Sequence, residues 1–524
     1  MTDGVMMEDF LQVYEIALKL YKDNKLDEAW QCITFWEKKT GAYALLSMLL
    51  KAYILRQKKC YVSEVEMLGE LLKLYGNDAD KSRIADAYSL LGSSLRMLGE
   101  SRLSMEAFLK SAETEPRVER KLPEVSNALF TANAIEDISA TELQAMYGMY
   151  RTLLEFAGVK AYLAPDWQHD KIRVGYISAD WRNHAVGQFV RPLLFNYDTE
   201  QFEVFVYQLN KSCDAVTNDL HKSSVKWREI ADFSFEDIAA QIRADEIDIL
   251  VDLGGHTAGN ALPVLAYRPA RKQISGIGYF NSTGIDECDG FLSDVYCASA
   301  TTSPYFTEKL LRLPHTHFCY QPYKVFPDVK PPPCMKNGYI TFGSFNNFAK
   351  VNDGMLALWR EILAHVPHSR LVLKHMLLGT EEGLNYTKKR MSDLGMDLSR
   401  IEFRDYSEDY LQQYNDIDIA LDTSPYPGGL TTCEALYMGI PVVTLKGNRH
   451  GANFGYSFLA NIGLEELAAD TKEGYVNLAV GLSCDVQLLQ ELRKRLRGMM
   501  EESPLMDSAG YMKDLEELYQ EILR

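Results

Sequence analysis

Apolar residues in the first 116 positions recur every three or four residues, which is the period of one helix face. On this basis helices are predicted at residues 10–21, 26–36, 43–55, 62–75 and 84–98. The same period continues at residues 124–134 and 141–156 and stops before Pro165. The sequence therefore predicts an all-helical domain over residues 1–116, followed by a helical linker over residues 117–168.

One part of the helical domain matches the tetratricopeptide repeat pattern. The residues at the expected spacings are Tyr88, Leu91, Gly92, Leu95, Gly99, Phe108 and Pro116. Ser104 and Ser111 stand where small residues let the two helices of a repeat touch. Such repeats stack on their neighbours to bury their apolar faces. Two interpretations are open: a concave peptide-binding surface, or a short helical cap that only adds stability.

From Lys171 onward the pattern changes to short apolar runs that alternate with helical segments. Strands are predicted at residues 172–177, 202–207, 247–252, 273–279, 290–294, 309–313, 339–344, 370–374, 401–403, 417–421 and 442–445, with a last helix at about 511–523. Pro331, Pro332 and Pro333 interrupt the series. The pattern predicts an α/β fold of two doubly wound, Rossmann-like parallel-sheet domains over residues 169–333 and 334–524. Ligands of such domains bind where the carboxyl ends of the strands face a cleft.

The stretch at residues 418–436 combines a buried strand, a Pro-Gly turn and the start of a helix. A helix predicted at residues 431–438, after a turn that ends at Gly429, would present free N–H groups and a positive dipole end, which suits a phosphate. Thr431 and Thr432 could add hydroxyl donors, and Glu434 could accept hydrogen bonds from sugar hydroxyls. The alternative is an ordinary capped turn between a strand and a helix.

Polar loops follow several other predicted strands. His184 lies in the loop after the first strand, and His256 follows two glycines at the end of another. In the second domain Asn347 and Lys350 follow the first strand, and a lysine there can stabilise a negatively charged leaving group. Each residue alone could be an ordinary surface side chain. Because all of them lie at the same end of predicted strands, the sequence favours a nucleotide-sugar cleft.

The composition excludes several other classes of protein. The chain has 524 residues, 47% hydrophobic and 24% charged, as expected for a globular protein. A net charge of -18 argues against nucleic-acid or membrane-surface binding. We expect no signal peptide and no membrane span. The nine cysteines form no CxxC pair and the ten histidines no HxxxH or HExxH motif, so we expect a cytoplasmic protein without a metal site.

Five motifs resemble those of the O-linked N-acetylglucosamine transferase family, in particular its short bacterial-type, SPINDLY-like members. They are residues 173–178 with 183–184, 252–257, 343–347, 418–436 and 438–444, and they occur in the order typical of the family. The resemblance implies a GT-B fold and an inverting, metal-independent transfer of a sugar from a nucleotide diphosphate to protein Ser or Thr. The donor it implies is UDP-N-acetylglucosamine as a substrate, with no further cofactor. The partner is a protein acceptor, recruited by the helical repeats.

The resemblance also assigns roles to the candidate residues. Lys350 would stabilise the diphosphate, with Asn347 beside it, and the helix that starts with Thr431 and Thr432 would hold the phosphates. Glu434 takes the place of the ribose-binding carboxylate.

His184 would lie near the reacting sugar as the candidate general base, a role that sequence alone does not settle. His256 would line the donor pocket.

The chain departs from the family pattern at four positions. Tyr410 replaces a histidine that packs on the nucleobase, although a phenol ring can also stack. Leu430, Phe280 and Asn453 replace a His or Thr, a Pro and an Arg. Three alternatives therefore stay open: another nucleotide sugar on the same fold, a catalytically degenerate tetratricopeptide scaffold, and a nucleotide-sugar epimerase.

Overall fold

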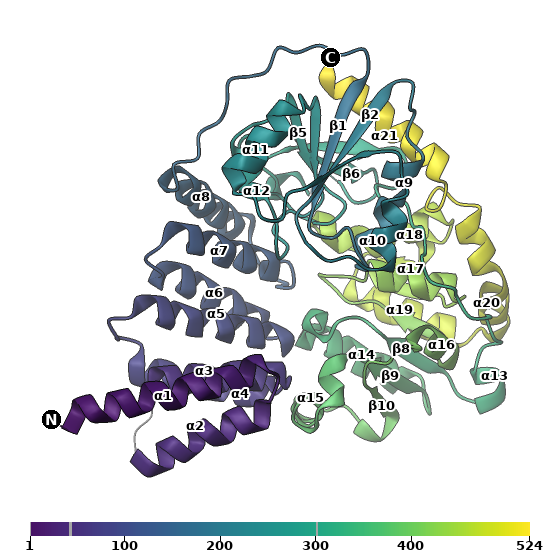
Figure 1. Ribbon diagram of the computed structural model, residues 1–524. Coiled ribbons are helices and arrows are strands. Elements are labelled where there is room, and N and C mark those ends of the chain that lie inside the picture. The colour runs from purple at the N-terminus through teal and green to yellow at the C-terminus, as the bar shows by residue number, and fades with distance from the viewer. Residues whose placement is uncertain (1, 41–43, 300–301) are drawn as a thin grey trace.

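The structure is a computed structural model that describes residues 2–40, 44–299 and 302–524, with side chains from residue 10 onward. A column of helices stands beside two α/β lobes, one above the other in the view of Figure 1. The predicted fold class, an all-helical region followed by two Rossmann-like domains, is confirmed. The exact domain boundaries stay a prediction.

In the helical region, consecutive helices pack antiparallel to each other and are joined by short turns. Its helices are α1 (Thr2–Lys22), α2 (Leu26–Thr40), α3 (Leu45–Gln57), α4 (Tyr61–Tyr75), α5 (Lys81–Met97), α6 (Ser101–Thr114), α7 (Val118–Ala132) and α8 (Ala140–Phe156). All seven predicted helical stretches are confirmed as helices, except that Tyr43, the first residue of one, lies outside the described residues.

Small residues bring α5 and α6 close together. The Ser104 hydroxyl donates to the Gly92 carbonyl at 2.6 Å, and the Ser111 hydroxyl donates to the Ala85 carbonyl at 2.8 Å. A Cβ atom at Gly92 would lie 3.0 Å from the Phe108 ring. The tetratricopeptide spacing therefore describes a real helix-pair contact, since each small residue leaves room for a specific neighbour.

The first lobe is a fully parallel sheet in the order β3-β2-β1-β4-β5-β6-β7. Its elements are β1 (Ile172–Ser178), α9 (Gly187–Phe195), β2 (Phe202–Gln208), α10 (Ala215–Leu220), β3 (Lys226–Glu229), α11 (Phe235–Ala244), β4 (Ile249–Asp252), α12 (Leu262–Ala266), β5 (Lys272–Ser275), β6 (Gly290–Asp294), η1 (Ser303–Tyr305) and β7 (Lys309–Leu313). The central strands are buried, which explains their nearly continuous apolar sequences.

Two details of the first lobe differ from the sequence prediction. The edge strand β3 was not predicted, because Lys226, Arg228 and Glu229 give it the composition of a loop. An edge strand has a neighbour on one side only and tolerates such charges. The strand predicted to reach residue 279 ends at Ser275, and the chain then turns at Ile277, where φ is 63°.

The second lobe is also fully parallel, in the order β10-β9-β8-β11-β12-β13. Its elements are α13 (Cys334–Asn337), β8 (Thr341–Ser344), η2 (Phe348–Lys350), α14 (Asp353–His365), β9 (Arg370–Lys374), η3 (Met376–Gly379), α15 (Glu381–Asp393), η4 (Leu398–Arg400), β10 (Ile401–Arg404), α16 (Tyr410–Gln413), η5 (Tyr414–Asp416), β11 (Ile419–Leu421), α17 (Leu430–Tyr437), β12 (Val442–Leu445), η6 (His450–Asn453), α18 (Phe454–Asn461), η7 (Glu465–Leu467), β13 (Ala468–Ala469) and α19 (Lys472–Ser483). The edge strand β13 was missed because two residues carry no periodic signal.

The last two helices, α20 (Val486–Glu501) and α21 (Ser508–Leu523), return the chain to the first lobe. Figure 1 shows the C-terminus beside β1 and β2. The Tyr519 hydroxyl lies 3.2 Å from the Tyr176 hydroxyl of β1, and the Tyr511 hydroxyl donates to the His317 carbonyl at 3.3 Å. The end of the chain thus ties the two lobes together.

The helical region contacts both lobes. Against the second lobe, Arg390 donates to the Leu98 carbonyl at 3.3 Å and the Tyr386 hydroxyl donates to Glu100 at 2.7 Å. Arg449, also of the second lobe, donates to carbonyls at the end of α7.

Among the residues that the structure describes, no helix combines the length and apolar character needed to cross a membrane.

Candidate active site

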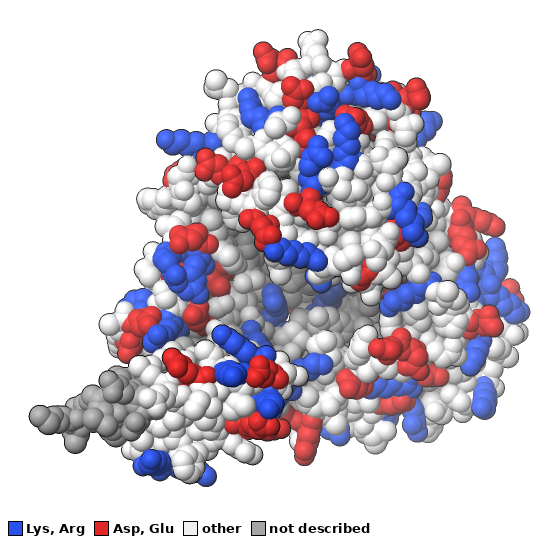
Figure 2. All heavy atoms as spheres, viewed as in Figure 1, with Lys and Arg blue, Asp and Glu red and all other residues white. Residues whose placement is uncertain are grey.

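A cavity of about 510 Å³ lies where the two lobes and the helical region meet. Figure 2 shows a hollow at the centre of this face, with blue basic atoms inside it. Six of the nine predicted site residues line the cavity: His184, His256, Asn347, Lys350, Gly429 and Thr431. The other three, Tyr410, Thr432 and Glu434, are not among its described lining residues.

A buried carboxylate shapes the turn between β11 and α17. Asp422 accepts hydrogen bonds from the backbone N–H groups of Gly428 at 2.7 Å and Thr423 at 2.9 Å. It also accepts from the Asn346 amide at 3.0 Å and the Thr444 hydroxyl at 2.9 Å. Burial raises the pKa of Asp422, and these donors oppose the shift. This residue holds the turn in place, although the sequence analysis assigned it no role.

The turn delivers the start of α17 to the cavity. Among the described residues no side chain caps this helix, whose N-cap is Gly429, so its first N–H groups remain available to a ligand. A Cβ at Gly428 would lie 2.4 Å from the Thr432 hydroxyl oxygen, whereas one at Gly429 would meet nothing within 4 Å. Close packing therefore requires glycine at 428.

The two predicted threonines differ in what they offer. The Thr431 hydroxyl lies at the cavity and donates to the Asn346 side-chain oxygen. The Thr432 hydroxyl is buried and donates to the Gly428 carbonyl at 3.1 Å, inside the first turn of α17. Its backbone N–H can still contribute to an anion site, but its hydroxyl is already engaged.

Lys350 approaches the same turn from η2. Its ammonium donates to the Pro427 carbonyl at 2.9 Å and lies 3.9 Å from the centre of the Tyr426 ring. Burial lowers the pKa of Lys350 to about 8, while the charge of Asp422 opposes the shift. Asn347 caps η2, since its side-chain oxygen accepts from the backbone N–H two residues later at 3.0 Å. The lysine charge is thus held beside the N-terminus of α17.

His184 projects from the loop after β1, across the cavity from Lys350. Its Nδ1 lies 3.4 Å from an Asp180 carboxylate oxygen and 3.4 Å from the Val186 backbone N–H. Burial lowers the pKa of His184, and Asp180 and Arg182 shift it in opposite directions. The imidazole is therefore neutral near pH 7, and its Nδ1 contact decides whether Nε2 accepts or donates a proton.

His256 is buried and has both ring nitrogens engaged. Nδ1 lies 2.9 Å from the Ser126 hydroxyl of α7, and Nε2 lies 2.8 Å from the Thr283 carbonyl. The rings of Tyr150 and Tyr279 pack on it edge to face. Burial lowers the pKa of His256 to about 4, so the ring stays neutral. His256 lines the cavity, and it also joins the helical region to the first lobe.

Tyr410 of α16 and Glu434 of α17 form a separate pair. The Tyr410 hydroxyl donates to the Glu434 carboxylate, and the Lys324 ammonium donates to the Tyr410 oxygen at 3.0 Å. Burial raises the pKa of Glu434 to about 7, while Tyr410 and Lys324 oppose the shift. Tyr410 engages one carboxylate oxygen, so a ribose hydroxyl would have to share that oxygen or use the other one.

The helical region supplies cavity residues that the sequence analysis missed. Arg96 and Phe130 line the cavity from α5 and α7. The Arg96 guanidinium stacks 5.7 Å from the centre of the Phe108 ring and 5.5 Å from that of Phe130. The Phe130 ring also packs against the rings of Tyr426 and Phe280, and the centres of those two rings lie 4.5 Å apart. No local sequence signal marks these residues, because residues on an amphipathic helix are usually interpreted as part of the packing between helices.

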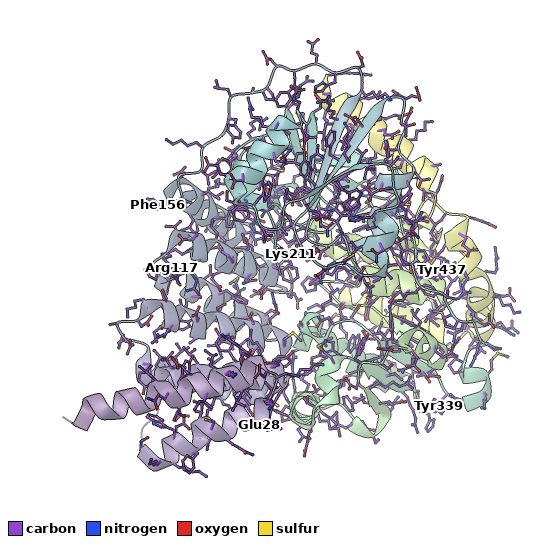
Figure 3. All side chains as sticks on the ribbon, in the orientation of Figure 1. Glu28, Arg117, Phe156, Lys211, Tyr339 and Tyr437 are labelled. Carbon is purple, nitrogen blue, oxygen red and sulfur yellow. The ribbon has the colours of Figure 1, made fainter. Side chains whose placement is uncertain are left out.

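The cavity is more basic than the rest of the protein. Its described lining contains the cations Arg96, Arg182 and Lys350 and a single carboxylate, Asp180, in a chain of net charge -18. Arg117 and Phe156 mark the outer side of the helical region, facing away from the lobes (Figure 3). The inner side of that region contributes Arg96 to the cavity and so adds a cation to a site suited to an anionic ligand.

The departures from the family pattern have different consequences. Phe280 and Leu430 line the cavity and make it more apolar. Asn453 is buried in a loop, where its amide donates to the Gly447 and Arg449 carbonyls at 3.0 Å. Asn453 is not among the described lining residues of the cavity. Its replacement of an arginine therefore affects the loop and not the cavity lining.

Two parallel-sheet lobes that face a basic cavity, with a helix N-terminus at the end of a central strand, define a GT-B glycosyltransferase fold. The chain matches the model of glycosyl transferase family 41 at residues 159–337 and 333–515. It therefore belongs to that family, and the resemblance inferred from its motifs is confirmed.

The relatives agree with this assignment. The chain is 38% identical to the SPINDLY protein of Petunia hybrida over 358 residues, which is 67% of this chain and 38% of that protein. It is 38% identical to SPINDLY of Arabidopsis thaliana over 355 residues, 66% of this chain and 39% of that protein. The chain thus spans about two fifths of the length of the curated relatives it matches.

A solved structure matches the whole chain. A lysine-to-methionine variant of the Thermobaculum terrenum O-GlcNAc transferase superposes with a TM-score of 0.84 and 25% sequence identity. The match covers 100% of this chain and 98% of that one, so the helical region and both lobes share one arrangement.

Proposed function

We propose that this protein is an inverting O-glycosyltransferase that moves N-acetylglucosamine from UDP-N-acetylglucosamine to Ser or Thr residues of proteins. The observation that carries the proposal is the convergence of Lys350, Arg96 and the uncapped N-terminus of α17 on one cavity. The SPINDLY relatives carry the name "Probable UDP-N-acetylglucosamine–peptide N-acetylglucosaminyltransferase", which supports this donor and this class of acceptor.

The reaction follows from the charges around the cavity. The acceptor hydroxyl attacks the anomeric carbon from the face opposite the diphosphate; a new carbon–oxygen bond forms and the bond to the diphosphate oxygen breaks. Negative charge grows on the departing UDP, where the Lys350 ammonium and the N–H groups of α17 stabilise it. Because these groups are already in place, they interact most strongly with the transition state.

The proton of the acceptor hydroxyl needs a base, and His184 is our candidate. If Nδ1–H donates to Asp180, Nε2 is free to accept the proton and Asp180 stabilises the resulting imidazolium. If Nδ1 instead accepts from the Val186 N–H, Nε2 carries the hydrogen and His184 can only donate. The proposal therefore requires the tautomer that pairs with Asp180.

The helical region supports an acceptor-binding role. Arg96, Asn127 and Phe130 reach the cavity from its inner face, so a peptide lying there would contact both the repeats and the reaction centre. A helical cap that served stability alone would not need these side chains. A cytoplasmic location, predicted from the scattered cysteines, is part of the same proposal.

A different nucleotide sugar on the same fold is the second candidate. The apolar side chains of Phe280 and Leu430 line the cavity where the family pattern has a proline and a polar residue. They could change which sugar fits, while leaving the diphosphate contacts unchanged.

A thermal-shift and intact-mass screen tests both candidates. The purified protein is mixed with UDP, GDP, TDP, CMP and their sugars, with and without lysate from the native host. Stabilisation by UDP and UDP-N-acetylglucosamine, plus an N-acetylhexosamine mass on a lysate protein, is the expected result. Another nucleotide sugar in their place would establish the second candidate, and no response to any nucleotide would favour a scaffold.

A further inference from the structure

Three buried side chains that can bind a metal meet at the boundary of the two lobes. Cys297 follows β6 and His317 follows β7, both in the first lobe, whereas His450 begins η6 in the second. Their exposed fractions are 0%, 0% and 1%. One candidate ligand atom from each, a sulfur and two imidazole nitrogens, lies within 4.8 Å of the other two.

Each histidine already has its Nδ1 oriented by an oxygen. His317 Nδ1 lies 2.5 Å from an Asp294 carboxylate oxygen, and His450 Nδ1 lies 3.2 Å from the Phe280 carbonyl. The same Asp294 oxygen accepts from the Ser457 hydroxyl of α18 at 2.8 Å. Histidines that bind metals usually donate Nδ1–H to a carboxylate or carbonyl in this way, which points Nε2 at the metal.

The remaining nitrogen of each ring lacks a protein partner. The Nε2 atoms of His317 and His450 are both buried without a hydrogen bond in the part of the chain that the structure describes. Their ring centres lie 5.0 Å apart. Leaving two polar atoms unpaired side by side is costly, and an ion between them is one of the few arrangements that satisfies both.

We propose that Cys297, His317 and His450 bind a Zn²⁺ ion that joins the two lobes. Thiolate and imidazole are ligands that zinc prefers, and three protein ligands leave a further coordination position. The Cys297 thiol would release its proton on binding. One thiolate and the Asp294 carboxylate would then balance the two positive charges of the ion, which suits a site buried between the lobes, and a water molecule would take the fourth position.

The position of this site gives it a structural role. Phe280, Phe318 and Phe454 line the cavity described above, and the ring centres of Phe318 and Phe454 lie 4.0 and 5.6 Å from that of His317. The ion would therefore lie behind the apolar wall of the cavity and fix the first lobe against the second. It makes no contact with the groups assigned to sugar transfer, so the proposal does not depend on the proposed function.

Elemental analysis of the full chain, purified without chelators, tests the proposal. We expect about one zinc per chain in the wild type. We expect almost none in Cys297→Ser, and an unchanged amount in Cys319→Ser, which alters another buried free cysteine close by. Asp294→Asn keeps the three ligands and loses the carboxylate that orients His317, so zinc affinity should fall roughly tenfold to a hundredfold.

Cobalt provides a readout that does not depend on stability. The protein stripped of metal should take up Co²⁺ and show a thiolate-to-cobalt charge-transfer band in the wild type and in Cys319→Ser, but not in Cys297→Ser. A wild type without zinc that also gives no such band would overturn the proposal. So would equal zinc in the wild type and Cys297→Ser, and copper or iron at these ligands would overturn the assignment to zinc.

Discussion

Replacing Lys350 with alanine should slow sugar transfer by roughly a hundredfold to a thousandfold while the fold persists. The ammonium lies beside the Pro427 carbonyl and the Tyr426 ring at the edge of the cavity, where the proposed diphosphate would bind. For unit charges about 4 Å apart in such a half-buried setting, the interaction is about 4 kcal/mol. Each 1.36 kcal/mol changes a rate tenfold, so about three orders of magnitude is the upper end of the effect.

The assay measures kcat and KM with UDP-N-acetylglucosamine and an acceptor found in the mass screen. Most of the loss should appear in kcat, because the diphosphate charge that Lys350 meets grows in the transition state. The binding of UDP should weaken less. The substitution leaves the Pro427 carbonyl without its donor, which costs about 1 kcal/mol, so Tm should fall by only about 1 °C in a chain of this size.

Lys446→Ala is the matched control. Lys446 also lies in the second lobe and packs on an aromatic ring, that of Tyr456, but it pairs with Asp470 and is not a described lining residue of the cavity. It should keep full turnover. Full turnover in Lys350→Ala, or a loss of activity that follows unfolding in both variants, would refute the role assigned to Lys350.

Three further predictions concern pH and packing. Because the pKa of Lys350 is lowered to about 8, the free enzyme loses the lysine cation above that pH, and kcat/KM should fall as the pH rises beyond 8. Lys350→Arg should move this fall to higher pH, and an unchanged profile would mean that another group titrates. Gly428→Ala should abolish the thermal shift with UDP, because the added Cβ would clash with the Thr432 hydroxyl, whereas Gly429→Ala should keep the shift. The same thermal shift in both variants would contradict the packing argument. Ser126→Ala should lower the free energy of unfolding in urea by about 1–3 kcal/mol, because it leaves the buried His256 Nδ1 unpaired. An unchanged urea midpoint would show that water replaces the hydroxyl.

Much of the fold could be predicted from the sequence because the relevant signals are local. A buried parallel strand such as β4 is apolar at almost every position, and a helix such as α5 repeats its apolar residues at the helical period. The prediction failed where the signal is weak. The edge strand β3 is rich in charge, and β13 has only two residues.

The candidate site was predictable in part for the same reason. His184, Lys350 and Thr431 lie in the segments that follow strands, and the carboxyl ends of parallel strands share one edge, so their meeting at one cavity followed from the order of the elements. The hydrogen bonds that occupy Thr432 and Glu434 could not be predicted, because they depend on side-chain positions.

By itself, the sequence determined the order of the elements, the two-lobed architecture and the strand ends that carry polar residues. Only the tertiary structure decided that Arg96 and Phe130 of distant helices complete the cavity, and that Cys297, His317 and His450 meet at the boundary of the lobes. Periodicity and motif spacing report neighbours within a few residues. Contacts between segments far apart in the chain depend on how the lobes and helices pack, which no local pattern records.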